Sequence, residues 1–347
     1  MATQNYGTVA SRNLIRAELK MLKMVENISV LGKFGDQKEQ PLNKTDTVVF
    51  RRLRPFNFTS AETPGIVAAN FIASEGVTPT ANTISYTDVT SRVDQYSVLF
   101  KFSSKAQLMY EDDIPADMLR LTSTTLSEVA ELVCYGQVKA GSSVIYANGS
   151  TRSGLSREIG LKNLQNAARS MESNRAMKVT EMIKPGADFG TAPIEPAYIV
   201  FHHTDCSSDV RKLPGFTKRV EYGSAIKPVH DREIGACEDF RFVPSPLFAP
   251  FLAAGAALTT AVGMKAADAT TSDVYPYIVM AESAWGQVSL KGHGVTAINP
   301  TIIPANVKNH ANPSAMFGFV GADFWYSAVR LNENWMTRIE ACVSDLA

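Results

Sequence analysis

The feature that most constrains the fold is a long stretch, 55–92, that is rich in Thr, Ser, Gly and Pro and has few large apolar residues. Strand-like patterns flank it at 47–53 and 96–102, and we expect these two to pair as the base of a long hairpin. Connections inside compact domains are typically about 4–6 residues long, so a plain loop is excluded. The pattern at 84–89 favours strand over disorder. We therefore expect an extended segment whose partner surface lies on another chain.

The composition indicates a folded protein without a strong charge bias. The 347 residues are 45% hydrophobic and 20% charged, which is enough to bury one or two cores. The 34 basic residues are balanced by 34 acidic ones. Dedicated nucleic-acid binders usually carry a basic excess, so any contact with nucleic acid is expected to be weak.

The cysteines and the apolar segments indicate in which cellular compartment the protein is expected. The four cysteines form no close pair, which favours buried free thiols over a zinc site or a disulfide framework. The first residues lack the basic and apolar regions of a secretory signal, so we expect the protein in the cytoplasm. The apolar run 247–267 is interrupted by Pro250, Gly255, Gly263 and Lys265. It predicts a buried helix or a mobile loop rather than a membrane span.

Helical periodicity predicts two main helices in the first half of the chain. Residues 11–31 have an amphipathic pattern, and the polar 32–46 that follows is expected to be an extended arm. A second helix is expected at about 112–140: Asp112, Asp113 and Pro115 suit its first turn, and it should run to about Lys139, with Gly141 as its stop. At about 25 residues it would span nearly 40 Å. Its expected apolar face comprises Met118, Leu121, Leu126, Val129, Leu132 and Val133.

The second half mixes helix and strand patterns without strict alternation, which indicates an α+β fold. A helix is expected at 161–177, and strands at 197–201, 240–243, 274–280 and 324–331. The alternating apolar residues of 335–343 predict a strand that closes a sheet.

Two groups of residues raise the question of a metal site. His202, His203, Asp205 and Cys206 are four potential ligands in five positions. Neighbouring side chains diverge on a strand, however, so we expect a strand end followed by a short helix that Thr204 or Asp205 caps. The acids 111–113 are ordinary complements of a helix N-terminus. With no catalytic motif present, we expect neither a metal nor a cofactor, and no enzyme.

Charged residues gather on the expected hairpin. Arg51, Arg52 and Arg54 could contact phosphate or pair with a neighbouring subunit, and Arg51 and Arg52 should face opposite sides of the strand. We predict seven residues of the hairpin as inter-subunit contacts: Arg51, Arg52, Arg54, Glu75, Tyr86, Asp88 and Arg92.

Ordered strings along the whole chain resemble the major capsid proteins of tailed bacteriophages (Caudoviricetes), in the branch typified by the enquatroviruses. Two of them are Asn-Lys-Thr-Asp-Thr-Val-Val-Phe-Arg-Arg at 43–52 and Leu-Asn-Glu-Asn-Trp-Met at 331–336. The others occupy 33–35, 75–79, 86–89, 146–149, 213–216, 233–235 and 273–276.

The resemblance implies the HK97-like (Hong Kong 97-type) capsid fold. In that fold an N-terminal arm would cover 1–46 and an extended hairpin, the E-loop, 47–104. A peripheral domain with a spine helix would cover 105–154 and an axial domain 155–295, and 296–347 would return to the peripheral domain.

The resemblance also implies a structural role in the virion. The chain would form hexamers and pentamers of an icosahedral head, assembled in the host cytoplasm around double-stranded DNA that it touches weakly and non-specifically. Its partners would be further copies of itself, a portal, and a scaffold or decoration protein, with no membrane. Relatives that cross-link do so through a Lys and an Asn, and no such pair is identified in this sequence. The alternatives are a phage tail or baseplate protein and a metal-dependent enzyme.

Overall fold

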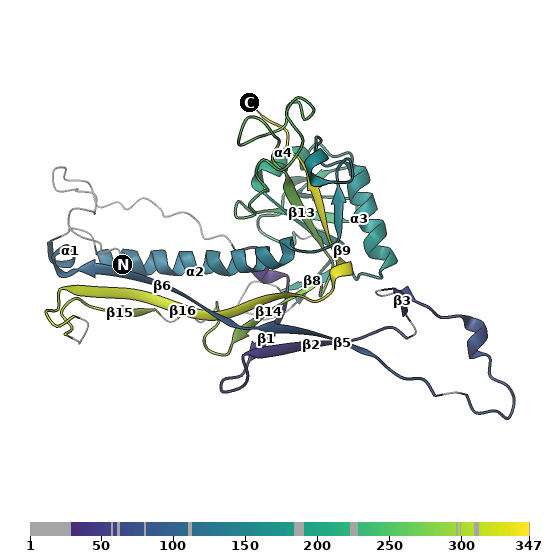
Figure 1. The fold of residues 1–347 in the computed structure, drawn as a ribbon, viewed down its shortest axis with the longest axis horizontal. Helices are drawn as coiled ribbons and strands as arrows, with labels where there is room; N and C mark the ends of the chain where they lie inside the picture. Colours follow the sequence, from purple (N-terminus) through teal and green to yellow (C-terminus); the bar gives the residue numbers. More distant parts are fainter. Residues whose placement is uncertain are drawn as a thin grey trace.

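The computed structural model describes residues 29–56, 58–60, 63–79, 81–109, 113–183, 191–222, 228–295, 298, 300–308 and 312–346. It has three parts, which Figure 1 shows side by side. A long platform carries helix α2, a compact domain rises from one end of the platform, and a hairpin arm projects beyond that end. The helix predicted over 11–31 lies almost entirely outside the described residues.

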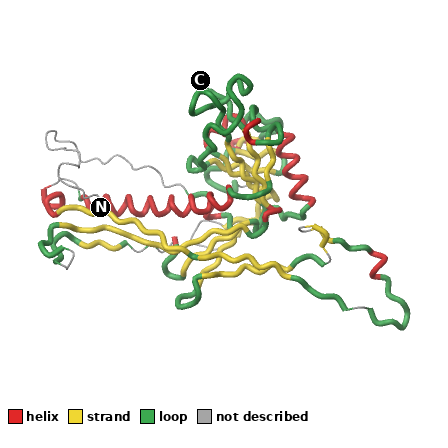
Figure 2. The backbone as a smooth tube through the Cα atoms, in the orientation of Figure 1, coloured by secondary structure: helices red, strands yellow, loops and turns green. Residues whose placement is uncertain are grey.

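The platform is a five-stranded sheet built around its longest strand. Strand β16 (Phe317–Arg330) pairs antiparallel with β6 (Asp94–Ser103), β14 (Trp285–Leu290) and β15 (Thr301–Ile303). Strand β1 (Asp36–Gln40) adds to β14 in parallel. Every second residue of β16 from Gly318 to Ala328 is buried, so one face of the strand is covered. Helix α2 lies along this face, parallel to the strands in Figure 2.

Helix α2 (Ile114–Lys139) confirms the predicted helix. The Asp113 side chain accepts a hydrogen bond from the backbone N–H of Ala116, and Pro115 lies in the first turn. Leu126 is fully buried against the sheet, as expected, but Leu121 and Leu132 are exposed. The apolar face is narrower than predicted because a single sheet covers only one stripe of the helix.

The compact domain contains an eight-stranded sheet in the order β10-β11-β12-β9-β13-β17-β7, with β8 paired to β9. The strands are β7 (Val144–Tyr146), β8 (Val179–Ile183), β9 (Thr191–His202), β10 (Thr217–Lys218), β11 (Gly235–Cys237), β12 (Phe240–Pro244), β13 (Tyr275–Met280) and β17 (Met336–Ala341). Helix α3 (Leu161–Ser173) packs on this sheet through Leu164, Ala167 and Met171. All four cysteines are free and buried, as predicted.

Within this sheet, β17 forms an interior strand. It lies between β13 and β7 rather than at the edge of the sheet, so the expectation that 335–343 closes a sheet is wrong. Its burial on both faces reflects this position. The short helices are α1 (Ser104–Met109) at the far end of the platform, α4 (Ser207–Val210) in the compact domain, and single 3₁₀ turns.

The pairing predicted for the hairpin base is wrong. Strand β2 (Thr47–Leu53) pairs antiparallel with β5 (Tyr86–Arg92), whereas the predicted partner segment 96–102 lies within β6 and pairs with β16. The two consecutive strands β5 and β6 are separated only by the buried residue Val93, whose N–H donates to the carbonyl of Asp46. Local patterns identified the strands but not their partners, because pairing depends on distant contacts.

Two connecting segments also differ from expectation. The segment 32–46 is not merely an extended arm. It begins within a 3₁₀ turn, η1 (Leu31–Lys33), and then forms strand β1. Leu31 is fully buried there, and the carboxylate of Glu131 on α2 accepts hydrogen bonds from the N–H groups of Val30 and Leu31. The apolar run 247–267 is irregular rather than helical and forms isolated bridges, including Phe251 to Val274.

None of the helices in the described ranges combines the length and apolar composition that a membrane crossing requires.

Candidate assembly surface

The arm comprises residues 47–92 and is ordered at its base by a continuous ladder. Strands β2 and β5 pair from Thr47 opposite Arg92 to Leu53 opposite Tyr86. The N–H of Arg54 then donates to the carbonyl of Ser85 at 3.0 Å. Further out lie only the short pair β3 (Phe58–Ser60) and β4 (Thr63–Pro64) and a 3₁₀ turn, η2 (Ala68–Phe71). The arm therefore has a continuously paired, two-stranded base and a distal part with little regular secondary structure.

Charged side chains fix the register of the base. The Arg51 guanidinium makes two hydrogen bonds of 2.8 Å to the Asp88 carboxylate directly opposite. This contact lowers the pKa of Asp88 below its usual value. Arg92 forms an ion pair with Asp46 at 3.1 Å, and the Arg54 Nε donates to the Thr87 hydroxyl. Such exposed pairs contribute little to stability, but they favour one register over its alternatives.

The seven residues predicted as inter-subunit contacts do not form one group. Arg51, Asp88 and Tyr86 lie together, since the Arg51 guanidinium is 5.6 Å from the centre of the Tyr86 ring. Arg52 faces the opposite way, as predicted, and lies 5.9 Å from the Trp335 ring. Glu75 is distant from both, in a turn at the end of the arm beside Gly76, whose φ of 77° suits glycine.

Exposed apolar side chains along the arm are the feature that the sequence reasoning missed. Of the side chains described between Leu53 and Tyr86, none is buried. Ile72 is 78% exposed and Ile84 71%. The other large apolar side chains exposed on this part of the arm are Leu53, Phe56, Ile66, Val67, Phe71 and Val77. The rings of Phe56 and Phe71 contact each other edge to face, with their centroids 5.9 Å apart.

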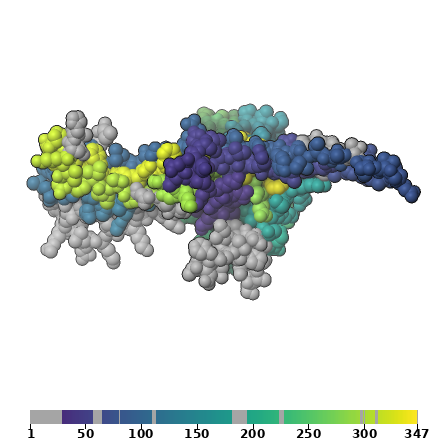
Figure 3. All heavy atoms as spheres, turned by 90° about the horizontal axis from the view of Figure 1, so that it is seen from below, coloured from purple at the N-terminus to yellow at the C-terminus, as the bar shows by residue number. Residues whose placement is uncertain are grey.

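This apolar arm stands clear of the body of the molecule. Figure 3 shows it, from below, as a narrow projection beyond the body of the molecule. Large exposed apolar patches are uncommon on soluble monomers, and sites that bind another protein are among the surfaces that they mark. The available sequence signal was the presence of isolated Ile, Val and Phe residues in a segment without helix or strand periodicity.

The predicted alternative, a metal site at 202–206, is not assembled. The His202 Nδ1 lies 2.8 Å from the carbonyl oxygen of His203, while the His203 Nδ1 accepts from the N–H of Asp205. His203 therefore caps the 3₁₀ turn Thr204–Cys206 that leads into α4, and the expectation of Thr204 or Asp205 as the cap is wrong. The Asp205 carboxylate instead binds the Lys265 ammonium at 2.7 Å and the Tyr275 hydroxyl at 2.9 Å.

Among the described residues, no group of three or more His, Cys, Asp and Glu side chains is placed to hold a metal ion. Of the acids 111–113, only Asp113 is described, and it caps α2.

Comparison with known proteins gives a fold but no family. No family model matches the chain, and no curated protein matches it. Many solved structures resemble it over nearly its whole length, and three of them illustrate the likeness. The capsid of Ralstonia phage GP4 matches with a TM-score of 0.63 at 9% identity, covering 97% of this chain and 100% of that one. The capsid of cyanophage P-SCSP1u matches with a TM-score of 0.57 at 12% identity, covering 94% and 91%.

The third is the head structure of Helicobacter pylori bacteriophage KHP40, with a TM-score of 0.57 at 10% identity and 96% of each chain covered. At these identities the likeness concerns the fold, and it confirms the predicted α+β, HK97-like architecture.

Proposed function

We propose that this chain, which has the HK97-like fold of phage capsids, is the major capsid protein of a tailed bacteriophage. Copies of it associate as hexamers and pentamers into an icosahedral head that encloses double-stranded DNA. The role is structural and requires no catalysis. Its location is the virion, after assembly in the bacterial cytoplasm.

The apolar arm is the observation that carries this proposal. Its side chains, Ile72 and Ile84 among them, are exposed and are not covered by the described part of their own chain. A second copy of the chain supplies that cover when each arm lies across its neighbour. Each contact is extended rather than deep, so many copies acting together make a strong shell.

The proposal extends to the division of the chain into parts. We assign 1–46 to the N-terminal arm, 47–104 to the E-loop, 105–154 to the peripheral domain with α2 as its spine, 155–295 to the axial domain and 296–347 to the return. Sheet membership crosses these boundaries, because β14 joins the platform and β17 joins the compact domain.

The balance of acidic and basic residues favours weak contacts, both with other copies of the chain and with DNA. The 34 basic and 34 acidic residues limit repulsion between copies and leave only weak, non-specific attraction to packaged DNA. A portal and a scaffold or decoration protein complete the proposed set of partners. Of the seven proposed contact residues, Glu75 and Tyr86 are exposed on the arm, whereas Arg51 and Asp88 bind each other within the chain.

Deleting the distal arm, 66–83, tests the proposal. The β2–β5 ladder and both cores lie outside the deletion, so the variant should fold with an unchanged melting temperature. Because it lacks most of the apolar surface, it should not form closed shells, whereas the parent chain should. Electron micrographs of both proteins, expressed with any scaffold they require, give the readout. Normal shells from the folded deletion variant would refute the proposed role of the arm.

A further inference from the structure

The C-terminal end of α2 is the point where the chain passes from the platform into the compact domain. After Lys139 the backbone runs through Gly141 directly into β7, which pairs with β17. The last carbonyl groups of a helix have no donors within the helix and need partners from elsewhere. At this end of α2, two side chains from other elements supply them.

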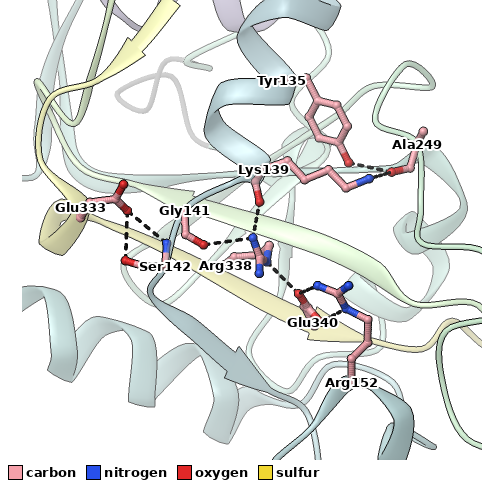
Figure 4. Close-up of polar contacts among 9 residues, drawn as sticks. All are labelled: Tyr135, Lys139, Gly141, Ser142, Arg152, Ala249, Glu333, Arg338 and Glu340. Atoms are coloured by element: carbon pink, nitrogen blue, oxygen red, sulfur yellow. Dashed lines mark hydrogen bonds and ion pairs between the residues drawn. The ribbon is translucent and has the colours of Figure 1, made fainter. Parts of the chain in front are cut away.

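Both donors are arginines. The Arg338 Nη1 donates to the carbonyl oxygen of Lys139 and, at 3.1 Å, to that of Gly141. Arg338 belongs to β17 of the compact domain, so this contact ties the platform helix to the other sheet (Figure 4). Arg330, the last residue of β16, donates to the carbonyl oxygen of Gln137 at 2.9 Å. Positive charges are also favourable at this position, because the C-terminal end of a helix dipole carries a partial negative charge.

A buried carboxylate holds Arg338 in place. Glu340 is fully buried, and it accepts from the Arg338 Nε at 2.8 Å. The same carboxylate takes two hydrogen bonds of 2.7 Å from Arg152, as Figure 4 shows. A carboxylate without solvent is stable only with cations around it, so the three residues act as a unit.

Further contacts converge on the same point. The carbonyl oxygen of Ala249 accepts from the Tyr135 hydroxyl and from the Lys139 ammonium, both at 2.8 Å. The Glu333 carboxylate, just after β16, accepts from the N–H of Ser142 at 3.1 Å. The cluster therefore joins the end of α2 to three segments of chain that are distant in sequence. Hydrogen bonds are directional, whereas apolar packing is not, so such a cluster can define an angle.

We propose that Arg152, Arg338 and Glu340 form a joint that fixes the angle between α2 and the compact domain. The joint belongs to the single chain and does not depend on assembly. An apolar cluster, including Leu126 and Phe201, also crosses between the two parts. If this packing alone fixed the angle, removal of the three charged side chains would leave the angle unchanged.

The informative variant replaces the whole unit. Removing only one partner would leave a buried charge unpaired and could unfold the protein. The triple variant Arg152→Met, Arg338→Met, Glu340→Leu removes every charge and keeps the bulk, which is often tolerated. It should therefore fold, with circular dichroism and a cooperative melt like those of the parent. Lys178→Met is the matched control, because Lys178 pairs with Asp239 inside the compact domain.

Spin labels on the full chain measure the angle. Ser123 on α2 and Asn166 on α3 are exposed, and the native cysteines are buried, so Ser123→Cys and Asn166→Cys can be labelled selectively. Ser123 lies roughly 24 Å from Lys139 along the helix axis at about 1.5 Å per residue, so a swing of about 10° moves it by about 4 Å. Pulsed electron resonance on dispersed chain, diluted with unlabelled protein, gives the distance distribution.

The parent and the Lys178→Met control should show one narrow distribution. The triple variant should show a broadened or displaced one, with a change of several ångströms. A triple variant that folds and keeps the narrow parental distribution would overturn the proposal and leave the apolar cluster as the element that sets the angle. If the triple variant does not fold, Arg338→Lys serves instead: it keeps the charge beside Glu340 but cannot span both carbonyl oxygens. A broadened or displaced distribution in Arg338→Lys supports the proposal, and the narrow parental distribution overturns it.

Discussion

The environment of His202 shows how burial decides the state of a single residue. The ring is fully buried between Phe242 and Tyr277, and its Nδ1 lies 2.8 Å from the backbone carbonyl oxygen of His203. Burial lowers the pKa of His202 to about 4. The imidazole is therefore neutral at physiological pH and acts as a packed core residue.

Stability should consequently depend on pH through His202. The unfolded chain takes up a proton near the ordinary pKa of 6.5, whereas the folded chain does so only near 4. The stabilising contribution is thus complete above about pH 6.5 and is lost as the pH falls toward 4, by roughly 3 kcal/mol at most. Denaturant unfolding of the parent and of His202→Gln across this range should show a steeper acid loss in the parent. Equal slopes would contradict this assignment.

Two glycines show opposite constraints on the elements that contain them. Gly136 lies on the exposed side of α2, and an added Cβ would meet nothing within 4 Å. Gly318 in β16 is buried, and a Cβ there would lie 2.2 Å from the ring of Phe102, which is itself fully buried. Gly136 thus lowers the stability of the helix, whereas the packing of the strand requires glycine at position 318.

Alanine at these two positions should therefore have opposite effects. Gly136→Ala should raise the free energy of unfolding by about 1 kcal/mol, because alanine loses less backbone entropy in a helix. Gly318→Ala should lower it by roughly 1–3 kcal/mol through overpacking. Thermal melts of the two variants measured beside the parent provide the comparison. A destabilised Gly136→Ala variant would indicate a contact on that side of α2.

At the scale of the whole molecule, the base and the distal part of the arm differ in what they contribute to the folded chain. Its base is fixed by internal ion pairs such as Arg51 with Asp88, while its distal part exposes apolar side chains. The folded state of one chain thus gains little from Ile72, which is 78% exposed. An assembled state would gain more, because burial of apolar area drives association.

Ile72→Asp should therefore leave the melting temperature of the dispersed chain unchanged and should strongly reduce shell formation. A charge buried in an apolar contact without a partner is costly. Ile72→Val, which keeps the apolar character, is the matched control and should assemble. Sedimentation and micrographs of the three proteins distinguish the cases. Efficient assembly of the Ile72→Asp variant would show that this side chain stays exposed in the shell.

The types of element could be predicted from the sequence where their signals were local. The acids and Pro115 of the first turn and the stop at Gly141 delimited α2, because each acts within one turn of the helix. The strand patterns of β2, β12 and β13 were recognised for a similar reason. The expectation that 55–92 meets an outside partner rests on the length and composition of that segment.

Only the tertiary structure decided which elements meet. It paired β2 with β5 rather than with β6, made β17 an interior strand and placed β1 in the platform sheet. It also brought Arg338 to Lys139, which is 199 positions away. Helix and strand patterns record neighbours a few residues apart. Strand register and buried ion pairs depend on contacts between distant segments, which one sequence does not reveal.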